Sequence, residues 1–274
     1  MATYVFSDVH GHLGTLERMF DRVSPSEGDR IFMLGDMIDR GPDPVGVLKF
    51  CRNLQQHHGA TVLMGNHEDL MLAFFADPHG PDAYVNWAIN GGLKTAEGLE
   101  KLEEDEIDDL LEWTRGLPLS ASARVGERLY FLSHAGLNRK GDWAAPVLDE
   151  GADDEARIAA LTKDQQMDDL VWVRHEFWGR PTGLVGTDGR GIIAIAGHTP
   201  TPYLDEIADR PDRPGRGEDG LGQMVRVGAC DQTGGVADRW DIDAGCAGGY
   251  GFGKLLLLRL DDGEEFYESV REGE

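Results

Sequence analysis

Apolar strands that stop abruptly in polar, glycine-containing loops are the feature that most constrains this chain of 274 residues. TYVFS (3–7) runs into DVHGH, DRIFMLG (29–35) runs into DMIDRG, and ATVLMG (60–65) runs into NHE. These short apolar runs alternate with helical patterns such as residues 44–56, which is typical of a sheet covered by helices on both faces. Because ligands in open α/β sheets bind outside the carboxyl ends of the strands, we expect a functional site at these loops.

Two later apolar segments end in the same way. ARVGERLYFLSHAG (123–136) predicts a hairpin whose second strand ends at His134. GIIAIAGHTP (191–200) predicts a buried strand that ends beside His198. The same arrangement therefore occurs five times, and we expect it to gather these polar side chains along one edge of the sheet.

The polar side chains at these strand ends suit a site for two metal ions. The candidate donors are carboxylates, imidazoles and one amide, from Asp8, His10, Asp36, Asn66, His134 and His198. Asp8 and His10 lie at positions i and i+2, so both can face one ion, and a carboxylate such as Asp36 can bridge two. Mixed oxygen and nitrogen donors without thiolate suit Mn, Fe, Zn, Co or Ni rather than a structural zinc site. Two such ions typically lie about 3.5–4 Å apart and act together at phosphorus.

The blocks SDVHG, GDMIDRG and GNHE, followed by single histidines in SHAG and GHTP, resemble the phosphoprotein phosphatase branch of the calcineurin-like metallophosphoesterases. They occur in the family's order over residues 3 to about 200, and WDIDAGC (240–246) resembles the closing motif of its bacterial members. The resemblance implies an α/β fold, the calcineurin-like metallophosphatase sandwich with two central mixed β-sheets flanked by α-helices. We therefore expect a single domain over residues 1–274, with substrate-pocket segments at about 69–120 and 137–190.

The same resemblance implies roles for individual residues. The first ion would be held by Asp8, His10 and Asp36, and the second by Asp36, Asn66, His134 and His198. A hydroxide bridging the ions would attack phosphorus directly, without a phosphoenzyme. His67 would protonate the leaving oxygen as general acid, and Asp39 would orient its imidazole and keep it protonated. Arg40 and Arg174 would hold phosphate oxygens.

These roles predict a metal-dependent phosphatase, with manganese as the expected metal pair and Fe, Zn, Co or Ni as the other choices. The first expectation is a protein serine/threonine phosphatase that hydrolyses phosphate monoesters of phosphorylated proteins. The alternative is a symmetrical bis(5'-nucleosyl)-tetraphosphatase acting on a dinucleotide, because the motifs do not separate the two activities. A non-catalytic metal-binding protein would lack a ligand or the general acid, and the sequence lacks neither. A DNA phosphodiesterase is disfavoured by the negative charge and by the DRG form of the second block.

Charge and cysteine content limit the expected binding partners and the expected cellular compartment. With 26 basic and 50 acidic residues the formal net charge is −24, which repels nucleic acid polymers and anionic membranes. Apolar runs are shorter than the roughly 18 residues of a membrane helix, and MATYVFSD lacks the pattern of a signal peptide. Cys51, Cys230 and Cys246 are scattered and odd in number, so we expect a reducing, cytoplasmic location.

Other polar and aromatic residues are expected to serve structure rather than chemistry. Glu68 would lie near the positive end of a helix, where a carboxylate is favourable. His12 could reach the substrate rim or face solvent, and no role is assigned to Cys246 or to the acidic segment 142–169. The remaining residues expected to be structural are His57, His58, His79, His175, Trp87, Trp172 and Trp178.

Overall fold

The computed structural model describes residues 1–78, 80–140, 147–149 and 151–274, and the chain divides into two compact units. Unit 1 comprises Met1–Pro118 and Gly245–Glu274, and unit 2 comprises Leu119–Ala244. His79 and parts of the segments 137–190 and 142–169 lie outside the described residues. That residues 1–274 form a single domain stays a prediction.

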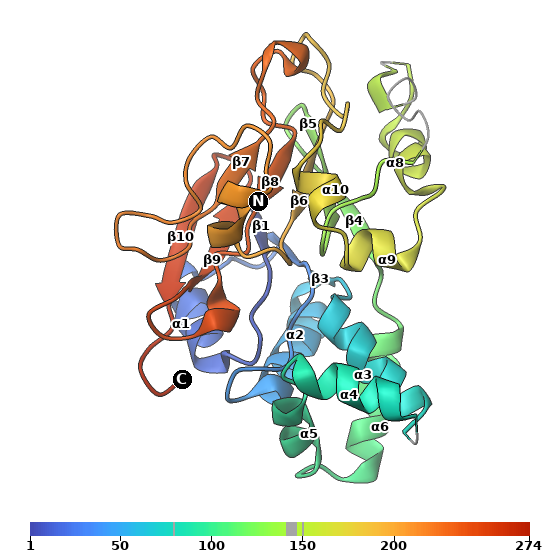
Figure 1. Cartoon of the computed structure of the whole chain (residues 1–274), viewed down its shortest axis with the longest axis vertical. Helices are drawn as coiled ribbons and strands as arrows, with labels where there is room; N and C mark the ends of the chain where they lie inside the picture. Colours follow the sequence, from blue (N-terminus) through green and yellow to red (C-terminus); the bar gives the residue numbers. More distant parts are fainter. Residues whose placement is uncertain (79, 141–146, 150) are drawn as a thin grey trace. The chain divides into compact units, whose positions relative to one another are not determined.

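The sheet of unit 1 is mixed and has the strand order β10-β9-β1-β2-β3 (Figure 1). Its strands are β1 (Thr3–Phe6), β2 (Arg30–Met33), β3 (Thr61–Val62), β9 (Lys254–Arg259) and β10 (Glu264–Ser269). β1, β2 and β3 run parallel, with Tyr4 opposite Ile31 and Phe32 opposite Thr61, whereas β9 runs antiparallel to β1 and β10. The carboxyl ends of the three parallel strands therefore share one edge, as the alternating pattern predicted.

The helices of unit 1 pack on this sheet or on one another. They are α1 (Leu13–Val23), α2 (Pro44–His58), α3 (Asn66–Ala76), α4 (Pro81–Ile89), α5 (Leu93–Leu99) and α6 (Glu104–Arg115). α1 packs on β9 and β10, α2 packs on β3, and α3 packs on α4 and α6. The ends of α2 follow from its sequence: the Asp43 carboxylate accepts the Gly46 N–H at 2.8 Å, Pro44 is the first residue, and Gly59 ends the helix at φ 66°.

The sheet of unit 2 is also mixed, with the strand order β4-β5-β6-β8-β7. Its strands are β4 (Ser120–Val125), β5 (Arg128–Ser133), β6 (Ile192–Ala196), β7 (Val225–Val227) and β8 (Arg239–Asp241). β4 and β5 form the hairpin expected over residues 123–136. β5, β6 and β8 run parallel, with Leu129 opposite Ile192 and Ala194 opposite Arg239, so three carboxyl ends again share an edge.

Short helices of unit 2 pack against this sheet. They are α8 (Asp154–Thr162), α9 (Met167–Val171), α10 (His175–Trp178) and the 3-10 turns η1 (Thr201–Glu206) and η2 (Asp231–Thr233). A further 3-10 turn, η3 (Cys246–Gly248), belongs to unit 1. One buried cluster joins Val171, Phe177 and Trp178 to Phe131 and Ile192. The sequence predicted irregular chain in 137–190, because the apolar positions of these helices are few and lie between acidic, proline and glycine residues.

The expected fold class is confirmed, since two mixed sheets flanked by helices make the chain an α/β protein. The strand expected at 60–65 is shorter, because the Met64 N–H donates to the Pro118 carbonyl at 3.0 Å and the chain leaves the sheet. Among the described residues, every helix is too short or too polar to traverse a lipid bilayer.

Arg239 is a fully buried cation in unit 2. Its guanidinium lies 2.9 Å from a carboxylate oxygen of Asp238 and 2.7 Å from one of Asp209. Nη1 also donates to three backbone carbonyl oxygens between Phe177 and Arg180, at 2.7–2.9 Å. This side chain therefore fixes the end of α10 against the sheet.

We expect Arg239→Met to lower the free energy of unfolding by about 3–5 kcal/mol, because the variant leaves the Asp238 carboxylate buried without its cation. The control Arg271→Met removes an exposed arginine 3.9 Å from Glu268 and should cost less than about 1 kcal/mol. Urea unfolding followed by circular dichroism measures both values. Equal, small losses would show that Arg239 does not hold the fold of unit 2.

Candidate functional site

The loops that follow β1 and β2 contain several non-glycine residues with left-handed backbone. Their φ values are 54° at Asp8, 45° at His10, 59° at Asp36, 70° at Asp39 and 64° at Arg40. This conformation costs roughly 1–2 kcal/mol per residue, so the surroundings must impose it. The Asp8 N–H donates to the Gly35 carbonyl at 3.1 Å, and the His10 N–H donates to the Asp36 carbonyl at 3.0 Å. Strain of this kind is concentrated at functional sites.

His10 and two carboxylates form the centre of the site in unit 1. His10 Nε2 lies 3.2 Å from Asp36 Oδ2 and 3.9 Å from Asp8 Oδ1, and all three side chains are buried. His10 Nδ1 donates to the Ile38 carbonyl at 2.9 Å, which leaves Nε2 as the nitrogen without a proton. Burial lowers the pKa of His10 to about 3 despite the Asp36 carboxylate, so the imidazole is neutral at pH 7. A neutral imidazole facing two carboxylates is a metal-ligand arrangement.

The buried Glu68 carboxylate ties the loop after β2 to the start of α3. It accepts backbone N–H groups of Asp36 (2.9 Å), Met37 (2.8 Å) and Gly65 (2.8 Å). Burial and the neighbouring Asp36 raise the pKa of Glu68 to about 7, while these N–H groups favour the charged form. The expectation that Glu68 serves at a helix start is confirmed, because α3 begins at Asn66.

Asp36 and the amino end of α3 are in close contact. Asp36 Oδ1 accepts the backbone N–H of His67 at 3.0 Å. A Cβ on Gly65 would lie 2.2 Å from the same oxygen, so only glycine fits at that position. Asn66, the first residue of α3, is 3% exposed beside them. The GNHE block thus delivers an amide and an imidazole next to the carboxylate of the DMIDRG block.

His67 and Asp39 form a buried pair. His67 Nδ1 donates to Asp39 Oδ2 at 2.6 Å. Asp39 also accepts from Trp87 Nε1, at 3.1 and 3.2 Å to its two oxygens, and from the Thr95 hydroxyl. Although burial opposes the charged imidazole, the Asp36 and Asp39 carboxylates raise the pKa of His67 above its usual value. The pair can therefore hold a proton on His67.

Sequence reasoning missed Trp87 and Thr95 as partners of Asp39. Trp87 is among the residues expected to be structural, and it is 2% exposed. Both residues lie in the segment 69–120, on α4 and α5. The available signal was the indole N–H, because a buried tryptophan usually finds a hydrogen-bond acceptor.

Arg40 extends from the loop after β2 over two imidazoles. Its Nη1 lies 3.2 Å from His10 Nε2, and its Nη2 lies 3.0 Å from His67 Nε2. The Arg40 backbone N–H donates to the Gly91 carbonyl at 3.3 Å, which connects the loop to the turn after α4. The guanidinium is therefore a planar donor at the edge of the candidate metal ligands, with the geometry that suits phosphate oxygens.

Unit 2 contributes two buried histidines from the ends of neighbouring strands. His134 follows β5 and His198 follows β6, and His134 Nε2 lies 3.2 Å from His198 Nδ1. The Gly197 N–H donates to the His134 carbonyl at 2.8 Å, which locks the two strand ends together. His198 has φ 66°, another left-handed residue at a strand end. Two imidazoles held this close can act as a pair of metal ligands.

Arg174 lies at the same loop of unit 2. Its Nη1 donates to the His198 carbonyl at 2.7 Å and to the Thr199 hydroxyl at 3.2 Å. The ring centroids of Trp172 and His198 are 6.1 Å apart, with the planes nearly perpendicular. Trp172 is 36% exposed and therefore borders the loop instead of filling the core.

The structure thus gathers the candidate residues into one set in each unit. Unit 1 brings together Asp8, His10, Asp36, Asp39, Arg40, Asn66 and His67, and unit 2 brings together His134, His198 and Arg174. Within unit 1, the ligand atoms of His10, Asp36 and His67 lie within 4.8 Å of one another. All three cysteines are free thiols.

His12 does not face solvent, because it is 3% exposed. Burial lowers the pKa of its imidazole, and its Nδ1 has no hydrogen-bond partner among the described residues. His57 and His58 are exposed at the end of α2, and Trp178 lies in the core of unit 2, as expected for structural residues. Cys246 Sγ lies 3.7 Å from the Val9 carbonyl, next to the first loop.

Known proteins resemble this chain along most of its length. A family model described as calcineurin-like phosphoesterase matches residues 1–228. A symmetrical bis(5'-nucleosyl)-tetraphosphatase of Azotobacter vinelandii is 28% identical over 291 residues, covering 96% of this chain and 95% of that protein. A protein of the same name from Erwinia tasmaniensis is 32% identical over 146 residues, covering 53% of this chain and 47% of the relative. This second alignment therefore spans about half of the relative's length.

Solved structures share the fold. One, provisionally named a diadenosine tetraphosphatase, has a TM-score of 0.56 at 17% identity and covers 99% of this chain and 95% of that chain. A protein serine/threonine phosphatase from Saccharomyces cerevisiae has a TM-score of 0.53 at 16% identity and covers 100% of this chain and 81% of that chain. At these identities the likeness concerns the fold alone.

We expect Asp39→Asn to lower the pKa of His67, because the variant removes the carboxylate bonded to Nδ1. The wild-type pKa is raised above 6.5. Protonation of His67 therefore stabilises the fold fully below pH 6.5, and this contribution is lost as the pH rises through the folded-state pKa. Asp39→Asn should therefore reduce the stability that protonated His67 adds to the fold below this pKa.

Imidazole NMR titration of metal-free protein measures this shift. The control Asp43→Asn changes the carboxylate that caps α2 and should leave the His67 titration unchanged. An unchanged His67 pKa in Asp39→Asn would mean that Asp39 does not control the proton of this imidazole.

Proposed function

The chain belongs to the calcineurin-like phosphoesterases, and from this premise we propose that it is a symmetrical bis(5'-nucleosyl)-tetraphosphatase, which splits a dinucleoside tetraphosphate into two nucleoside diphosphates. Family membership makes the protein an enzyme that hydrolyses phosphoester bonds. The proposed tetraphosphatase activity rests on the alignment with the Azotobacter protein of that name over 96% of this chain. The protein-phosphatase reading, first choice from the sequence, has less support because the yeast phosphatase shares the fold alone.

The donor set fits the divalent metal ions on which this family depends. His10 presents a neutral imidazole to two buried carboxylates, which need a cation nearby. We propose as ligands Asp8, His10, Asp36, Asn66, His134 and His198, with Asp36 shared and manganese as the metal. Bound ions of this kind lower the pKa of a coordinated water to about 7 and polarise phosphoryl oxygens.

His67 is proposed as the general acid, with Asp39 as the residue that positions it. The 2.6 Å bond from Nδ1 to Asp39 fixes the ring and leaves Nε2 to carry the proton toward the leaving oxygen. When a tetraphosphate is split, the leaving group is a nucleoside diphosphate, which is a weaker base than an alkoxide. The acid is therefore needed less for this substrate than for a phosphoserine ester.

Arg40 is proposed to orient the phosphates, together with Arg174. His67 Nε2 accepts from Arg40 Nη2 at 3.0 Å, so this nitrogen cannot carry a proton for the leaving group in the same arrangement. Substrate phosphate would draw the guanidinium away and free Nε2 for protonation. Arg40 would thus couple phosphate binding to readiness of the acid.

An exposed apolar face on α4 and α5 suits a nucleoside base. Tyr84 is 49% exposed, Ile89 is 76% exposed and Leu93 is 49% exposed. The turn between α4 and α5 accepts the Arg40 backbone N–H at Gly91, so these side chains flank a contact of the loop that carries Arg40. A base can bury its ring against aromatic and aliphatic side chains while its phosphates contact Arg40. This face lies in the segment 69–120, which the sequence predicted to line the pocket.

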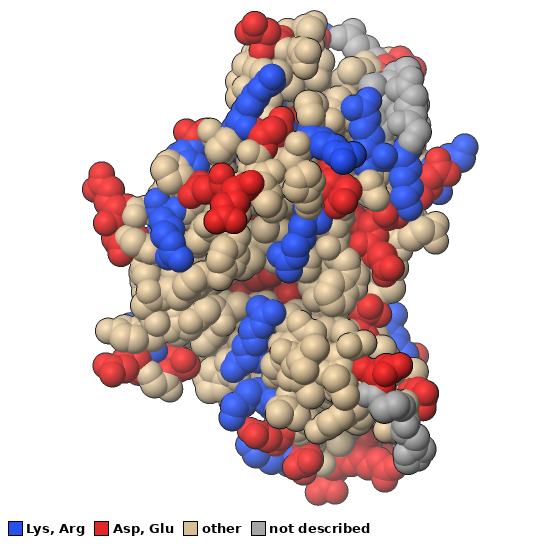
Figure 2. Space-filling view, in the orientation of Figure 1, with Lys and Arg blue, Asp and Glu red and all other residues tan. Residues whose placement is uncertain are grey.

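The charge distribution supports a small substrate rather than a polymer. On the face drawn in Figure 2, basic side chains are interspersed with acidic ones. The net charge of −24 adds repulsion toward nucleic acid polymers. The cytoplasmic location expected from the cysteines stays a prediction.

Offered a diadenosine tetraphosphate and a phosphoserine peptide in parallel, the manganese-loaded enzyme should prefer the dinucleotide by about a hundredfold in kcat/KM. Ile89→Lys should reduce that preference by charging the apolar face, without loss of activity on p-nitrophenyl phosphate. A control variant, Ile107→Lys on α6, adds the same charge at a half-buried isoleucine outside this face and should leave the preference intact. Preference for the phosphopeptide would overturn the proposal and restore the protein-phosphatase reading.

His67→Asn should slow hydrolysis of the phosphoserine peptide by about 10²–10⁴-fold, because an alkoxide leaving group needs the proton. The loss should be much smaller for p-nitrophenyl phosphate and for the dinucleotide, whose leaving groups are weaker bases. His57→Asn, an exposed histidine on α2, serves as the control and should change nothing. Steady-state kinetics measures each value, and equal losses on all substrates would exclude His67 as the acid.

A further inference from the structure

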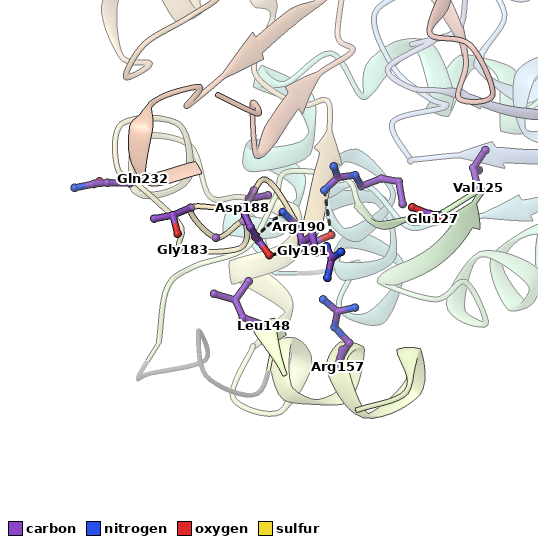
Figure 3. Close-up of a pocket in the computed structure, with 13 residues that line it drawn as sticks. Val125, Glu127, Leu148, Arg157, Gly183, Asp188, Arg190, Gly191 and Gln232 are labelled. Atoms are coloured by element: carbon purple, nitrogen blue, oxygen red, sulfur yellow. Dashed lines mark hydrogen bonds and ion pairs between the residues drawn. The ribbon is translucent and has the colours of Figure 1, made fainter. Parts of the chain in front are cut away.

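Unit 2 contains a large cavity that none of the proposed catalytic or ligand residues lines. Its volume is about 1120 Å³, and it lies among the β4–β5 hairpin, α8 and the loop that precedes β6 (Figure 3). Ligand pockets for small molecules typically measure about 300–1,000 Å³, so this cavity is large enough for a nucleotide-sized compound. The described residues that line it include charged and polar side chains beside Val125, Leu148 and Val185.

Three arginines from three different elements line this cavity: Arg128 on β5, Arg157 on α8 and Arg190 on the loop before β6. In Figure 3 the Arg157 side chain extends from its helix toward the loop that carries Gly191. Two carboxylates, Glu127 and Asp188, also line the cavity. Three positive and two negative groups give a formal charge of +1, in a chain whose net charge is −24.

Backbone carbonyls orient two of these arginines without neutralising them. Arg128 Nη2 donates to the Gly189 carbonyl at 3.0 Å, and its Nη1 donates to the Gly191 carbonyl at 3.4 Å. Arg157 Nε donates to the Val147 carbonyl at 2.7 Å. Since carbonyl oxygens carry no net charge, the positive charge of both guanidinium groups stays available to an anion.

The carboxylates of Asp154, near Arg157, and of Asp188, near Arg190, already accept hydrogen bonds. Asp154, on the same helix as Arg157, accepts two hydrogen bonds from Arg124, which chiefly lowers its pKa, with Arg157 adding a smaller effect. Asp188 Oδ1 accepts the Arg190 backbone N–H at 2.9 Å, and its Oδ2 lies 3.9 Å from Arg190 Nε. Among the described residues that line the cavity, arginines therefore outnumber carboxylates by three to two.

The loop that carries Arg190 is held in one shape. The Gly186 N–H donates to the Arg190 carbonyl at 2.8 Å, and Val185 forms an isolated bridge with Gly191. Gly191 has φ 138°, and a Cβ there would lie 2.1 Å from the Leu184 carbonyl oxygen, so only glycine fits. These contacts fix the backbone of the loop, so the exposed Arg190 side chain starts from the edge of the cavity before any ligand arrives.

We propose that this cavity binds a small, multiply charged anion of the oligophosphate class, at a site separate from the proposed catalytic residues. Guanidinium groups present paired N–H donors that match phosphate oxygens, and several phosphates can engage arginines on different elements at once. Thr187 and Gln232 also line the cavity, and both residue types carry neutral hydrogen-bond donors. The site does not depend on the proposed hydrolysis.

Inorganic tripolyphosphate is the probe, titrated into the metal-free chain of 274 residues by isothermal calorimetry at low ionic strength. The double variant Arg157→Gln/Arg190→Gln should weaken binding at least tenfold. Arg180→Gln removes one exposed charge outside the cavity in the same unit and should change the Kd less than twofold. The double variant should hydrolyse p-nitrophenyl phosphate as the wild type does, which also shows that it is folded.

Two further measurements separate this site from other anion binding. Arg40→Gln should leave tripolyphosphate binding intact, whereas loss of binding in that variant would place the anion at the proposed catalytic residues and overturn the proposal. Sulfate should bind at least tenfold more weakly than tripolyphosphate, because it engages fewer arginines at once. Equal binding of both anions, or binding unaffected by the double variant, would also overturn it.

Discussion

The buried carboxylate of Glu68 is the contact on which the first half of the site depends. One side chain accepts the backbone N–H groups of Asp36, Met37 and Gly65, and so joins the loop after β2 to the start of α3. Asp36 in turn accepts the backbone N–H of His67. These bonds hold the strained loop after β2 in place. Left-handed non-glycine residues persist only where the surrounding structure stabilises them.

Each unit uses the same construction. Parallel strands end at a common edge, and the residue at or just after the strand end carries a side chain suited to binding a cation. In unit 1 a neutral His10 faces carboxylates, and in unit 2 His134 and His198 face each other. Supporting contacts fix the orientation of individual ligands, as the Ile38 carbonyl does for His10, and the loss of such a contact typically costs about 10–100-fold in metal affinity or activity.

Much of this could be predicted from the sequence. Short apolar runs with polar ends predicted the strands, their direction and the loops that carry Asp8, Asp36 and His134. The partners of Asp39 could not be predicted, because Trp87 and Thr95 are 48 and 56 residues away and contact it only after α4 and α5 pack. The arginine cavity was missed for the same reason, because Arg128, Arg157 and Arg190 form no pattern along the chain.

By itself, the sequence determined the fold class, the family resemblance and the donor types at the strand ends, because periodicity and strand-end motifs are local properties. Only the tertiary structure decided the surroundings that set the pKa values of His10 and His67. It also decided which distant side chains contact Asp39. Burial lowers the pKa of His10 while neighbouring carboxylates raise that of His67, although both histidines follow the ends of strands. The difference arises because desolvation and carboxylate contacts depend on what packs around each ring, and distant segments supply that packing.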